Sequence, residues 1–389
     1  MTPTQAPPIS TFGLDRFFSE LVERGVANEP IDRTGALRVL SDQTLPILPL
    51  AHSAGLIRRH FFTNRVQIHM LHNVQCGACP EDCGYCGQAK TSDAPIAAHK
   101  LKSRDEILAD AQRAKEQGAF RYCMVLSGTG PDDHDIDHMA ECIAEVKSRF
   151  GLETCLSSGL MDEAKAKRLK AAGLDRLNHN LNTSADHYPS ICTTHTYADR
   201  LTTLRAARAA GLSVCSGLIV GMGETLDDLV DVALALRELG AESIPVNFLI
   251  PIAGNAISEP TCAGKLLTPL FCLRVLCMMR LVNPSAEVRL AAGREIHLRT
   301  LQPIALEPAN SLFIDGYLLT KGSPAVETIR MINDAGFELE HVDGALAMPL
   351  QTLLDSIDSP CAATDAAGIK PALLSERKLA KLRVSAPKA

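Results

Sequence analysis

The sequence of 389 residues contains no apolar run near the roughly 20 residues that a membrane-spanning helix needs. It also lacks an excess of positive charge, since 39 Lys and Arg stand against 45 Asp and Glu, a net charge of −6. This balance argues against nucleic acid or an anionic membrane as the main partner. The N-terminal stretch MTPTQAPPISTFGLDRFF has no basic start followed by an apolar core. We therefore expect no secretory signal and a cytoplasmic location.

Cysteine, by contrast, is plentiful, and its distribution is uneven. Of the 13 cysteines, four lie in the stretch CGACPEDCGYCGQ, residues 76–88. A chain of this length can bury a core without disulfides, and disulfides are rare in the reducing cytosol. The clustering therefore favours a metal or iron–sulfur site in this loop.

Short β-rich runs alternate with longer stretches of helical periodicity between about residues 66 and 337. The expected strands are 66–71, 122–127, 153–158, 175–182, 213–220, 243–250, 287–292 and 311–315. This pattern predicts the α/β class and a (β/α)8 TIM-type barrel. An open doubly wound sheet is the alternative, but no Gly-x-Gly-x-x-Gly turn follows the first strand.

The expected helices have clear ends. Ser103 and Glu106 have the spacing of a capping box. Glycines follow the helical stretches at positions 118, 151, 173, 211, 240 and 336. We expect a helical extension over residues 1–60, the barrel over 61–340, and a C-terminal extension over 341–389 that is largely disordered after about residue 355.

Alternate residues of a barrel strand face the interior and the helical layer in turn. One parity of the expected strands is apolar, as in Tyr122, Met124 and Leu126. The other parity carries Cys123, Cys155, Asn178, Asn180, Asn182, Cys215, Asn247 and Arg289, whereas His179 falls on the apolar parity and is not placed. Because unpartnered polar groups are costly to bury, this interior is expected to hold a ligand. Taken singly, each cysteine could equally be a small hydrophobic residue of the core.

The spacing Cys79-x3-Cys83-x2-Cys86 places three thiols in one loop after the first strand. Zinc sites usually use four protein ligands, commonly in separated Cys-x2-Cys pairs. The pattern resembles that of the radical S-adenosylmethionine (SAM) superfamily. The stretches GLETCLSSG, GLDRLNHNLNTS, TTHTYADRLTTL, SVCSGLIVGMGET, ESIPVNFLIPIAGNAI and VRLAAGRE resemble, in order, the biotin synthase family within it.

The resemblance implies two clusters. Cys79, Cys83 and Cys86 would ligate a [4Fe-4S] cluster that binds SAM. Cys123, Cys155, Cys215 and Arg289 would hold a [2Fe-2S] cluster, which agrees with their shared strand parity. Arg289 as a ligand rests on the resemblance alone, because arginine is normally protonated.

The resemblance also implies contacts to SAM and to the substrate. The contacts expected for SAM are Tyr85 beside the adenine, Asn180 and Asn182 at the ribose, Arg200 at the carboxylate, and the backbone of GLIVGMGE with Gly221 and Gly223. The contacts expected for the substrate are Asn180, Asn247, Thr320 and Lys321.

Three positions depart from the family pattern or add to it. Asn182 stands where some relatives carry Asp, and Asn can still meet a sugar hydroxyl. Lys321 stands where a second Thr is common, and it either pairs with the substrate carboxylate or is solvated. Cys76 is interpreted as a non-ligand, because the three later cysteines complete the pattern.

The activity implied by the resemblance is that of a sulfurtransferase forming biotin. A 5′-deoxyadenosyl radical from SAM would take hydrogen from dethiobiotin, and a sulfide of the inner cluster would enter the product. A homodimer and a flavodoxin or ferredoxin electron donor are expected on the same ground. Two alternatives stay open: another radical SAM reaction on a small molecule, and a non-catalytic iron–sulfur or zinc protein.

Overall fold

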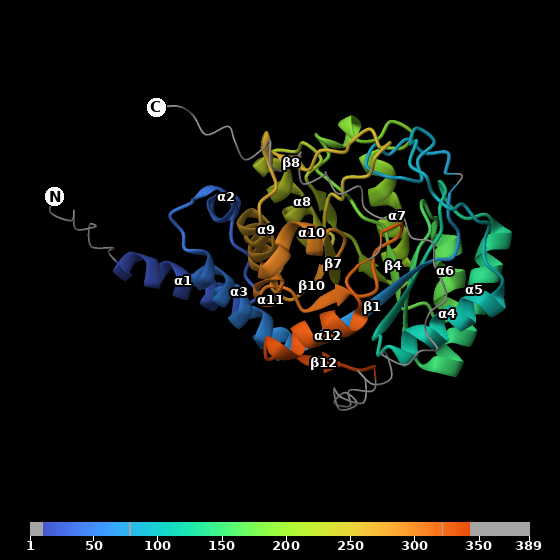
Figure 1. Ribbon diagram of the computed structural model, residues 1–389, viewed down its shortest axis with the longest axis horizontal. Helices are drawn as coiled ribbons and strands as arrows, with labels where there is room; N and C mark the ends of the chain where they lie inside the picture. The colour runs from blue at the N-terminus through green and yellow to red at the C-terminus, as the bar shows by residue number, and fades with distance from the viewer. Residues whose placement is uncertain (1–10, 78, 321, 343–389) are drawn as a thin grey trace.

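The computed structural model describes residues 11–77, 79–320 and 322–342 (Figure 1). Its centre is a parallel barrel. The barrel strands are β1 (Arg65–Asn73), β2 (Arg121–Val125), β3 (Glu153–Ser157), β4 (Arg176–Asn178), β5 (Ser213–Cys215), β6 (Leu218–Val220), β7 (Ser243–Phe248), β10 (Glu287–Leu290) and β11 (Ser311–Phe313). These strands pair in the order β1, β2, β3, β4, β5, β7, β10 and β11, with β6 paired to β7. The predicted (β/α)8 barrel is confirmed.

Closure of the barrel depends on strands that are distant in the sequence. β10 pairs with both β7 and β11, and β11 pairs with β1, so the ring is complete. β5 pairs with β4 and β7, while β6 pairs only with β7 among the described strands. β5 and β6 therefore act as two halves of one barrel strand, and the ring has eight positions.

The single strand expected over 213–220 is thus two short strands. The break falls at Ser216 and Gly217, where a Cβ on Gly217 would lie 1.9 Å from the carbonyl oxygen of Pro245. The Gly217 N–H donates to Oδ1 of Asn180 at 3.1 Å instead of continuing a strand ladder. A close backbone approach that only glycine permits therefore interrupts the strand beside the barrel interior.

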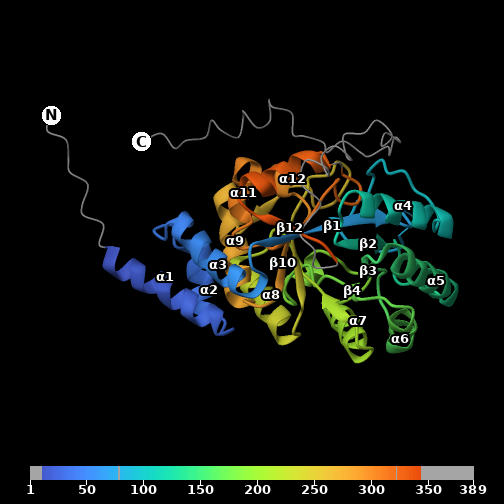
Figure 2. The same cartoon turned by 90° about the horizontal axis from the view of Figure 1, so that it is seen from below.

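Helices form an outer layer around the strands (Figure 2). The helices that follow the barrel strands are α4 (Arg104–Glu116), α5 (Asp133–Phe150), α6 (Glu163–Ala171), α7 (Tyr197–Ala209), α8 (Leu226–Glu238), α9 (Pro269–Val282), α10 (Arg294–Leu298), α11 (Gln302–Ala305) and α12 (Ala325–Asp334). The capping box of Ser103 and Glu106 begins α4 as expected. The apolar strand parity, including Tyr122, Met124 and Leu177, is fully buried between strands and helices. No helix of the described ranges is long and apolar enough to cross a membrane.

The N-terminal helices are α1 (Thr11–Val26), α2 (Arg33–Ser41) and α3 (Ile47–Phe62), which lie outside the barrel beside α8 and α9 (Figure 2). This confirms the expected helical extension. The remaining elements are η1 (Tyr188–Ser190), η2 (Arg299–Leu301), the hairpin β8 (Thr261–Cys262) with β9 (Lys265–Leu266), and β12 (Glu338–Glu340), which pairs with the start of β1. The C-terminal extension predicted to be disordered lies outside the described residues after position 342.

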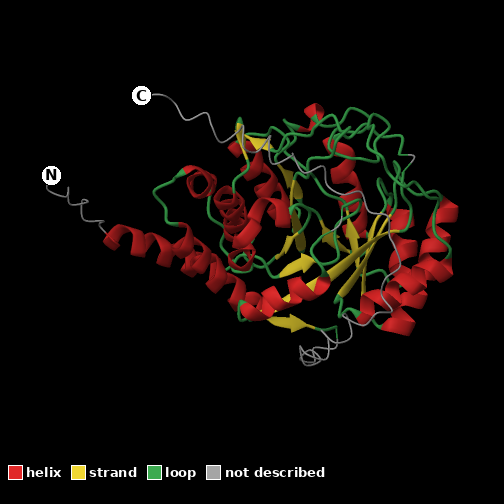
Figure 3. Cartoon of the chain, in the orientation of Figure 1, coloured by secondary structure: helices red, strands yellow, loops and turns green. Residues whose placement is uncertain are grey.

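Long loops gather at the end of the barrel toward which the strands run (Figure 3). They include the connection from β1 to α4, which carries the cysteine cluster, and the connection from β4 to α7, which carries η1. Catalytic groups of (β/α)8 enzymes lie at this C-terminal face.

Candidate functional site

A cavity of about 280 Å³ lies inside the barrel at this face. Most residues singled out from the sequence line it: Cys79, Cys83, Tyr85, Cys86, Cys123, Cys155, Asn178, Asn180, Asn182, Arg200, Asn247, Arg289 and Thr320. Segments more than 200 residues apart in the chain thus meet around one space. Cys215, Gly221 and Gly223 do not line it, and Lys321 lies outside the described residues.

The cysteine loop has no regular secondary structure and is held by contacts with its neighbours. The Cys86 N–H donates to the carbonyl of Cys83 at 3.0 Å, which forms a tight turn. The Gly84 N–H donates to Ile191, and Asn255 donates to the carbonyl of Tyr85 at 2.8 Å. Burial raises the pKa of both Cys83 and Cys86 above the ordinary thiol value. These thiols therefore need a cation beside them to be present as thiolates.

The second group of thiols lies deeper in the barrel. Cys123 and Cys155 face each other across β2 and β3, and Cys215 on β5 is fully buried. The Cys155 thiol lies beside those of Cys123 and Cys215. The alternating pattern in the sequence placed these three side chains on the interior parity, and the structure brings them into one cluster. Cys215 belongs to this thiol cluster even though it does not reach the cavity surface.

Arg289 completes the cluster of thiols. Its Nη1 donates to Sγ of Cys215 at 3.6 Å, while Nε and Nη2 donate to the carboxylate of Glu287. Nη2 also donates to Oγ of Ser243 at 2.7 Å, and the guanidinium lies 5.2 Å from the ring centre of Phe313. Burial alone would lower the pKa of Arg289, but Glu287 and the nearby thiols raise it above the ordinary value. The side chain is therefore held rigidly, with Nη1 directed at the sulfur atoms.

The polar residues assigned to SAM are linked to one another. Asn182 donates to the hydroxyl of Tyr85 at 2.6 Å, which joins the end of β4 to the cysteine loop. Asn182 has a φ of 70°, a conformation that asparagine tolerates better than most residues. Arg200 on α7 donates from Nη1 to the carbonyl of Asn180 at 2.8 Å. These four residues all line the cavity, and we refer to them together as its polar edge.

The backbone of Gly221 to Glu224 folds back on a buried carboxylate. The N–H groups of Gly221 and Met222 donate to Glu224 at 2.7 and 2.6 Å, and that of Gly223 donates to Thr261. Ile219, just before this turn, is the residue of the stretch that lines the cavity. The two glycines therefore shape the turn, and their expected contact with adenine stays a prediction.

Two of the residues assigned to the substrate, Asn247 and Thr320, are held by hydrogen bonds to the backbone. Asn247 donates to the carbonyl of Leu218 at 3.0 Å and accepts from the N–H of Ala292 at 3.1 Å. This fixes the amide between β6 and the end of β10. The hydroxyl of Thr320 donates to the carbonyl of Tyr317 at 2.9 Å. Whether Lys321 pairs with a carboxylate stays open, since it lies outside the described residues.

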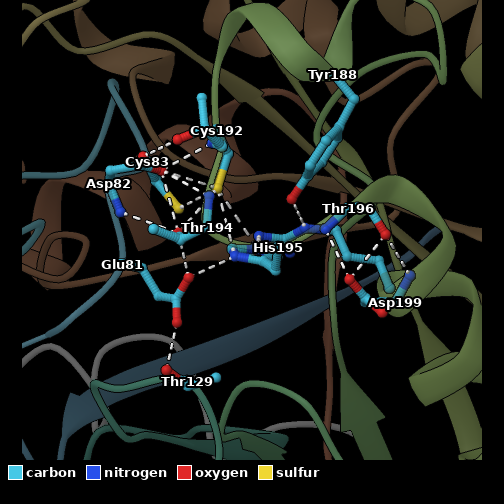
Figure 4. Close-up of polar contacts among 12 residues, drawn as sticks. Glu81, Asp82, Cys83, Thr129, Tyr188, Cys192, Thr194, His195, Thr196 and Asp199 are labelled. Carbon is cyan, nitrogen blue, oxygen red and sulfur yellow. Dashed lines mark hydrogen bonds and ion pairs between the residues drawn. The ribbon is translucent and has the colours of Figure 1, made fainter.

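The sequence analysis gave no role to three residues that line the cavity, Glu81, His179 and His195, or to Cys192 beside Cys83. Glu81 and His195 line the cavity and contact each other, with His195 Nδ1 lying 2.7 Å from Oε2 of Glu81 (Figure 4). His179 also lines the cavity, and its buried Nε2 contacts no partner within the described ranges. Cys192, which received no role, has its Sγ 3.7 Å from that of Cys83 and 3.3 Å from Nδ1 of His195. Cys83, Cys192 and His195 together have the spacing of a metal-ligand set.

Comparison with known proteins agrees with this geometry. Residues 75–236 match the model of the radical SAM superfamily, and residues 245–338 match the biotin and thiamin synthesis associated domain. The crystal structure of methylornithine synthase has the same fold, with a TM-score of 0.71 and 17% identity over 83% of this chain and 98% of that one. The fold and the cysteine loop thus define a radical SAM enzyme.

Two curated relatives give the finer placement. Biotin synthase of Acaryochloris marina is 51% identical over 86% of this chain and 96% of its own length. Biotin synthase of Bacillus subtilis is 44% identical over 83% of this chain and 96% of its own length. The chain belongs to the biotin synthase family.

Membership in this family implies a [4Fe-4S] cluster, SAM and a [2Fe-2S] cluster as cofactors. The described residues fit these groups, because one cavity brings together a loop with three thiols and a separate set of strand thiols beside a guanidinium. Thiolates are the ordinary protein ligands of iron–sulfur clusters.

Proposed function

We propose that this enzyme of the biotin synthase family forms biotin by inserting sulfur into dethiobiotin. The observation that carries this proposal is the presence of two separate thiol groups around one buried cavity. One group suits a cluster that binds SAM, and the other suits a cluster that supplies sulfur. A radical SAM enzyme with a single cluster would have no use for the inner set.

The cluster ligands follow the two groups. We assign Cys79, Cys83 and Cys86 to the [4Fe-4S] cluster, on the basis of their spacing and their position at the cavity. We assign Cys123, Cys155, Cys215 and Arg289 to the [2Fe-2S] cluster, on the basis of their mutual contacts. Glu287 supports this assignment because it fixes the Arg289 side chain on the face away from Cys215.

The polar edge of the cavity is assigned to SAM. Tyr85, Asn180, Asn182 and Arg200 lie along it, and Gly221 and Gly223 form the neighbouring turn. Asn180 and Asn247 flank the segment Gly217–Leu218, to which both side chains are hydrogen bonded, and with Thr320 and Lys321 they are assigned to dethiobiotin. Arg200 offers a fixed positive charge for a carboxylate, which is the recognition that a guanidinium suits best.

The chemistry divides between cofactors and protein. When bound, the cofactors supply hydrogen abstraction at unactivated carbon and the sulfur atom, steps that no side-chain base could perform. The chain orients both molecules through its asparagine amides and Arg200. Its barrel wall, in which Leu71, Phe313 and Tyr317 line the cavity, keeps water and stray hydrogen donors away.

Further parts of the assignment rest on the family relation. We propose a homodimer and a flavodoxin or ferredoxin as electron donor. A cytoplasmic location is supported by the free state of every cysteine among the described residues, as expected in a reducing compartment. We propose domain limits of 1–60 for the helical extension, 61–340 for the barrel and 341–389 for the C-terminal extension.

Anaerobic reconstitution with iron and sulfide tests the proposal, with C155A compared against C142A as the matched control. Cys142 is a buried thiol on α5 outside the cavity. We expect C155A to lose about a third of the iron, since a [2Fe-2S] cluster holds two irons and a [4Fe-4S] cluster four. C155A should still bind SAM but form no biotin, and C142A should match the wild type.

The alternatives predict different outcomes. A radical SAM enzyme with another reaction would keep its activity in C155A and form no biotin in the wild type. A non-catalytic iron–sulfur or zinc protein would bind metal but not cleave SAM. Either result would contradict the proposed function.

A further inference from the structure

A chain of polar contacts joins the cysteine loop to the start of α7 (Figure 4). It runs from Glu81 in the loop through His195 to Arg200, and we refer to these three residues as the bridge. Glu81 and Arg200 are each 7% exposed, so the bridge is shielded from water. Its members are separated by 114 and 5 positions in the chain.

The first half of the bridge ties two loops together. Glu81 accepts from Nδ1 of His195 at 2.7 Å and from the hydroxyls of Thr129 and Thr194. The neighbouring Asp82 accepts from the N–H groups of Thr193 and Thr194 at 2.9 and 3.2 Å. The segment 193–195 is therefore held in place by the two acidic residues between Cys79 and Cys83.

The second half of the bridge fixes Arg200. With its Nδ1–H donated to Glu81, His195 presents the lone pair of Nε2, and Nη2 of Arg200 donates to it at 2.8 Å. An imidazole can accept in this way only as the neutral tautomer that carries hydrogen on Nδ1. The carboxylate of Glu81 thus selects the form of His195 that can hold the guanidinium.

Arg200 retains free donors after these contacts. Its Nε donates to the hydroxyl of Tyr188, Nη1 to the carbonyl of Asn180, and Nη2 to His195. A guanidinium has five N–H groups, so one on each terminal nitrogen is left. Arg200 lines the cavity, and a pair of N–H groups on the two terminal nitrogens matches the two oxygens of a carboxylate.

We propose that Glu81 and His195 are positioning residues that orient Arg200 toward the carboxylate of SAM. The inference rests on the proposed function, since it takes SAM as the ligand of Arg200. It adds that the conformation of the cysteine loop and the affinity for the carboxylate of SAM are coupled through the bridge. If the cysteine loop lost its conformation, His195 would no longer be held in place, and the Arg200 guanidinium would lose its orientation.

Two substitutions of His195 separate the two halves of the bridge. Gln places its amide oxygen near the position of Nε2, so H195Q keeps an acceptor for Arg200. Asn places its amide near the position of Nδ1, so H195N keeps the contact with Glu81 and loses the acceptor. H134Q serves as control, because His134 is exposed on α5 outside the cavity.

The measurement is the dissociation constant of the reconstituted, anaerobic enzyme for SAM and for decarboxylated SAM, with iron content determined in parallel. We expect H195N to bind SAM on the order of tenfold more weakly, which corresponds to about 1.4 kcal/mol. The affinity of H195N for decarboxylated SAM should equal that of the wild type. Decarboxylated SAM has no carboxylate for Arg200 to contact, so neither protein makes the contact that the bridge supports. H195Q and H134Q should stay within about threefold of the wild type for both ligands.

The result that would overturn the proposal is equal weakening of both ligands in H195N, or unchanged binding of SAM. Equal weakening would show a general structural role, and unchanged binding would show that Arg200 needs no such support. Failure of the proposed function has a different signature: the wild type would form no biotin from dethiobiotin, whether or not it binds SAM. Iron content equal to that of the wild type in H195N and H195Q shows that both variants are folded and loaded.

E81Q provides a second test from the other end of the bridge. The amide oxygen of Gln can still accept from His195, but it carries no charge to favour the Nδ1–H tautomer. We expect E81Q to weaken SAM binding by a smaller factor than H195N, again with no change for decarboxylated SAM. A larger loss for decarboxylated SAM than for SAM would contradict the proposal.

Discussion

Cys192 is a fourth thiol beside the cysteine loop, with its Sγ 3.7 Å from that of Cys83. It also contacts Asp82 and His195, and it packs with Cys83, Tyr188 and Ile191 in a small buried cluster. A cubane cluster with an open iron for SAM uses three protein thiolates, which the loop already offers. We therefore expect Cys192 to be a neighbour of the proposed cluster and not one of its ligands.

We expect C192A to retain the iron and sulfide content of the wild type after anaerobic reconstitution, whereas C83A loses the [4Fe-4S] cluster. The physical reason is that Cys79, Cys83 and Cys86 complete the ligand set without help. Iron analysis and Mössbauer spectra of the two variants give the comparison. Loss of iron in C192A equal to that in C83A would make Cys192 a ligand.

At the scale of residues, the sequence revealed groups that are close together or repeat with a period. The cysteines of the loop lie within a few positions, and the parity of Cys123 and Cys155 follows from the two-residue repeat of strands. Cys192 and His195 had no such signal, because their partners lie more than 100 positions earlier in the chain. Contacts of this kind depend on how loops fold over the barrel, which no local pattern encodes.

At the scale of elements, Asp175 joins a strand to a helix. Its carboxylate accepts from the N–H and hydroxyl of Thr154 in β3, at 2.7 and 2.9 Å, and from Lys147 of α5 at 2.8 Å. Burial alone would raise the pKa of Asp175, but Lys147 and Thr154 lower it below the ordinary value. The ionised form is thus the one that stabilises the fold.

We expect D175N to lower the free energy of unfolding by about 1–3 kcal/mol at neutral pH. Because the pKa is depressed in the folded state, the stabilisation is complete above the ordinary pKa of 3.8 and is lost as the pH falls through the lower, folded value. The difference in thermal unfolding between wild type and D175N should therefore be constant from pH 7 to about 5 and shrink below about 4. D186N, at an exposed loop position, serves as control, and a difference that grows in acid would contradict the assignment.

Element boundaries were predicted well where local signals exist and poorly where tertiary contacts intervene. The capping box at Ser103 and the glycine after Phe150 mark helix ends through local hydrogen bonds. The strand expected over 213–220 is interrupted because Gly217 packs against Pro245 of a neighbouring strand. The alternation of apolar and polar side chains in that stretch does not predict this contact.

At the scale of the whole molecule, one buried arginine connects the helical extension to the barrel. Arg274 of α9 is 4% exposed and donates to the carbonyls of Val39 and Leu45 at 2.9 and 2.6 Å. Both carbonyls belong to the segment around the end of α2. Arg274 therefore satisfies two buried backbone groups that have few other partners.

We expect R274M to destabilise this connection, because each carbonyl left without a donor costs about 1–3 kcal/mol. The thermal unfolding temperature should fall, and limited proteolysis should cut the segment 27–46 sooner than in the wild type. R205M, at an exposed position of α7, is the control. Unchanged proteolysis of R274M would show that apolar packing alone holds the extension.

The fold class of the molecule could be predicted because (β/α)8 barrels repeat one local unit. Each strand, helix and terminating glycine has its own pattern, and their alternation specifies the class. The closure through β10 and β7 and the pairing of β12 with β1 could not be predicted in the same way, since they join strands by geometry and not by sequence order. The same holds for the way α2 and α3 lie against α9 and α1 lies against α3.

The inner thiols are closed off by protein at one end of the barrel and are accessible from the other. Glu287, Arg176 and Arg121 are the first residues of their strands, and their buried ion pairs and packing fill the barrel below Arg289. Any molecule that reaches Cys123, Cys155 and Cys215 therefore has to enter from the C-terminal face of the barrel, past the loop that carries Cys79. Sulfur lost from the inner site in a catalytic cycle would then have to be replaced in a fixed order. The groups held in the upper part of the cavity would have to leave or move aside before sulfur could reach the inner thiols again.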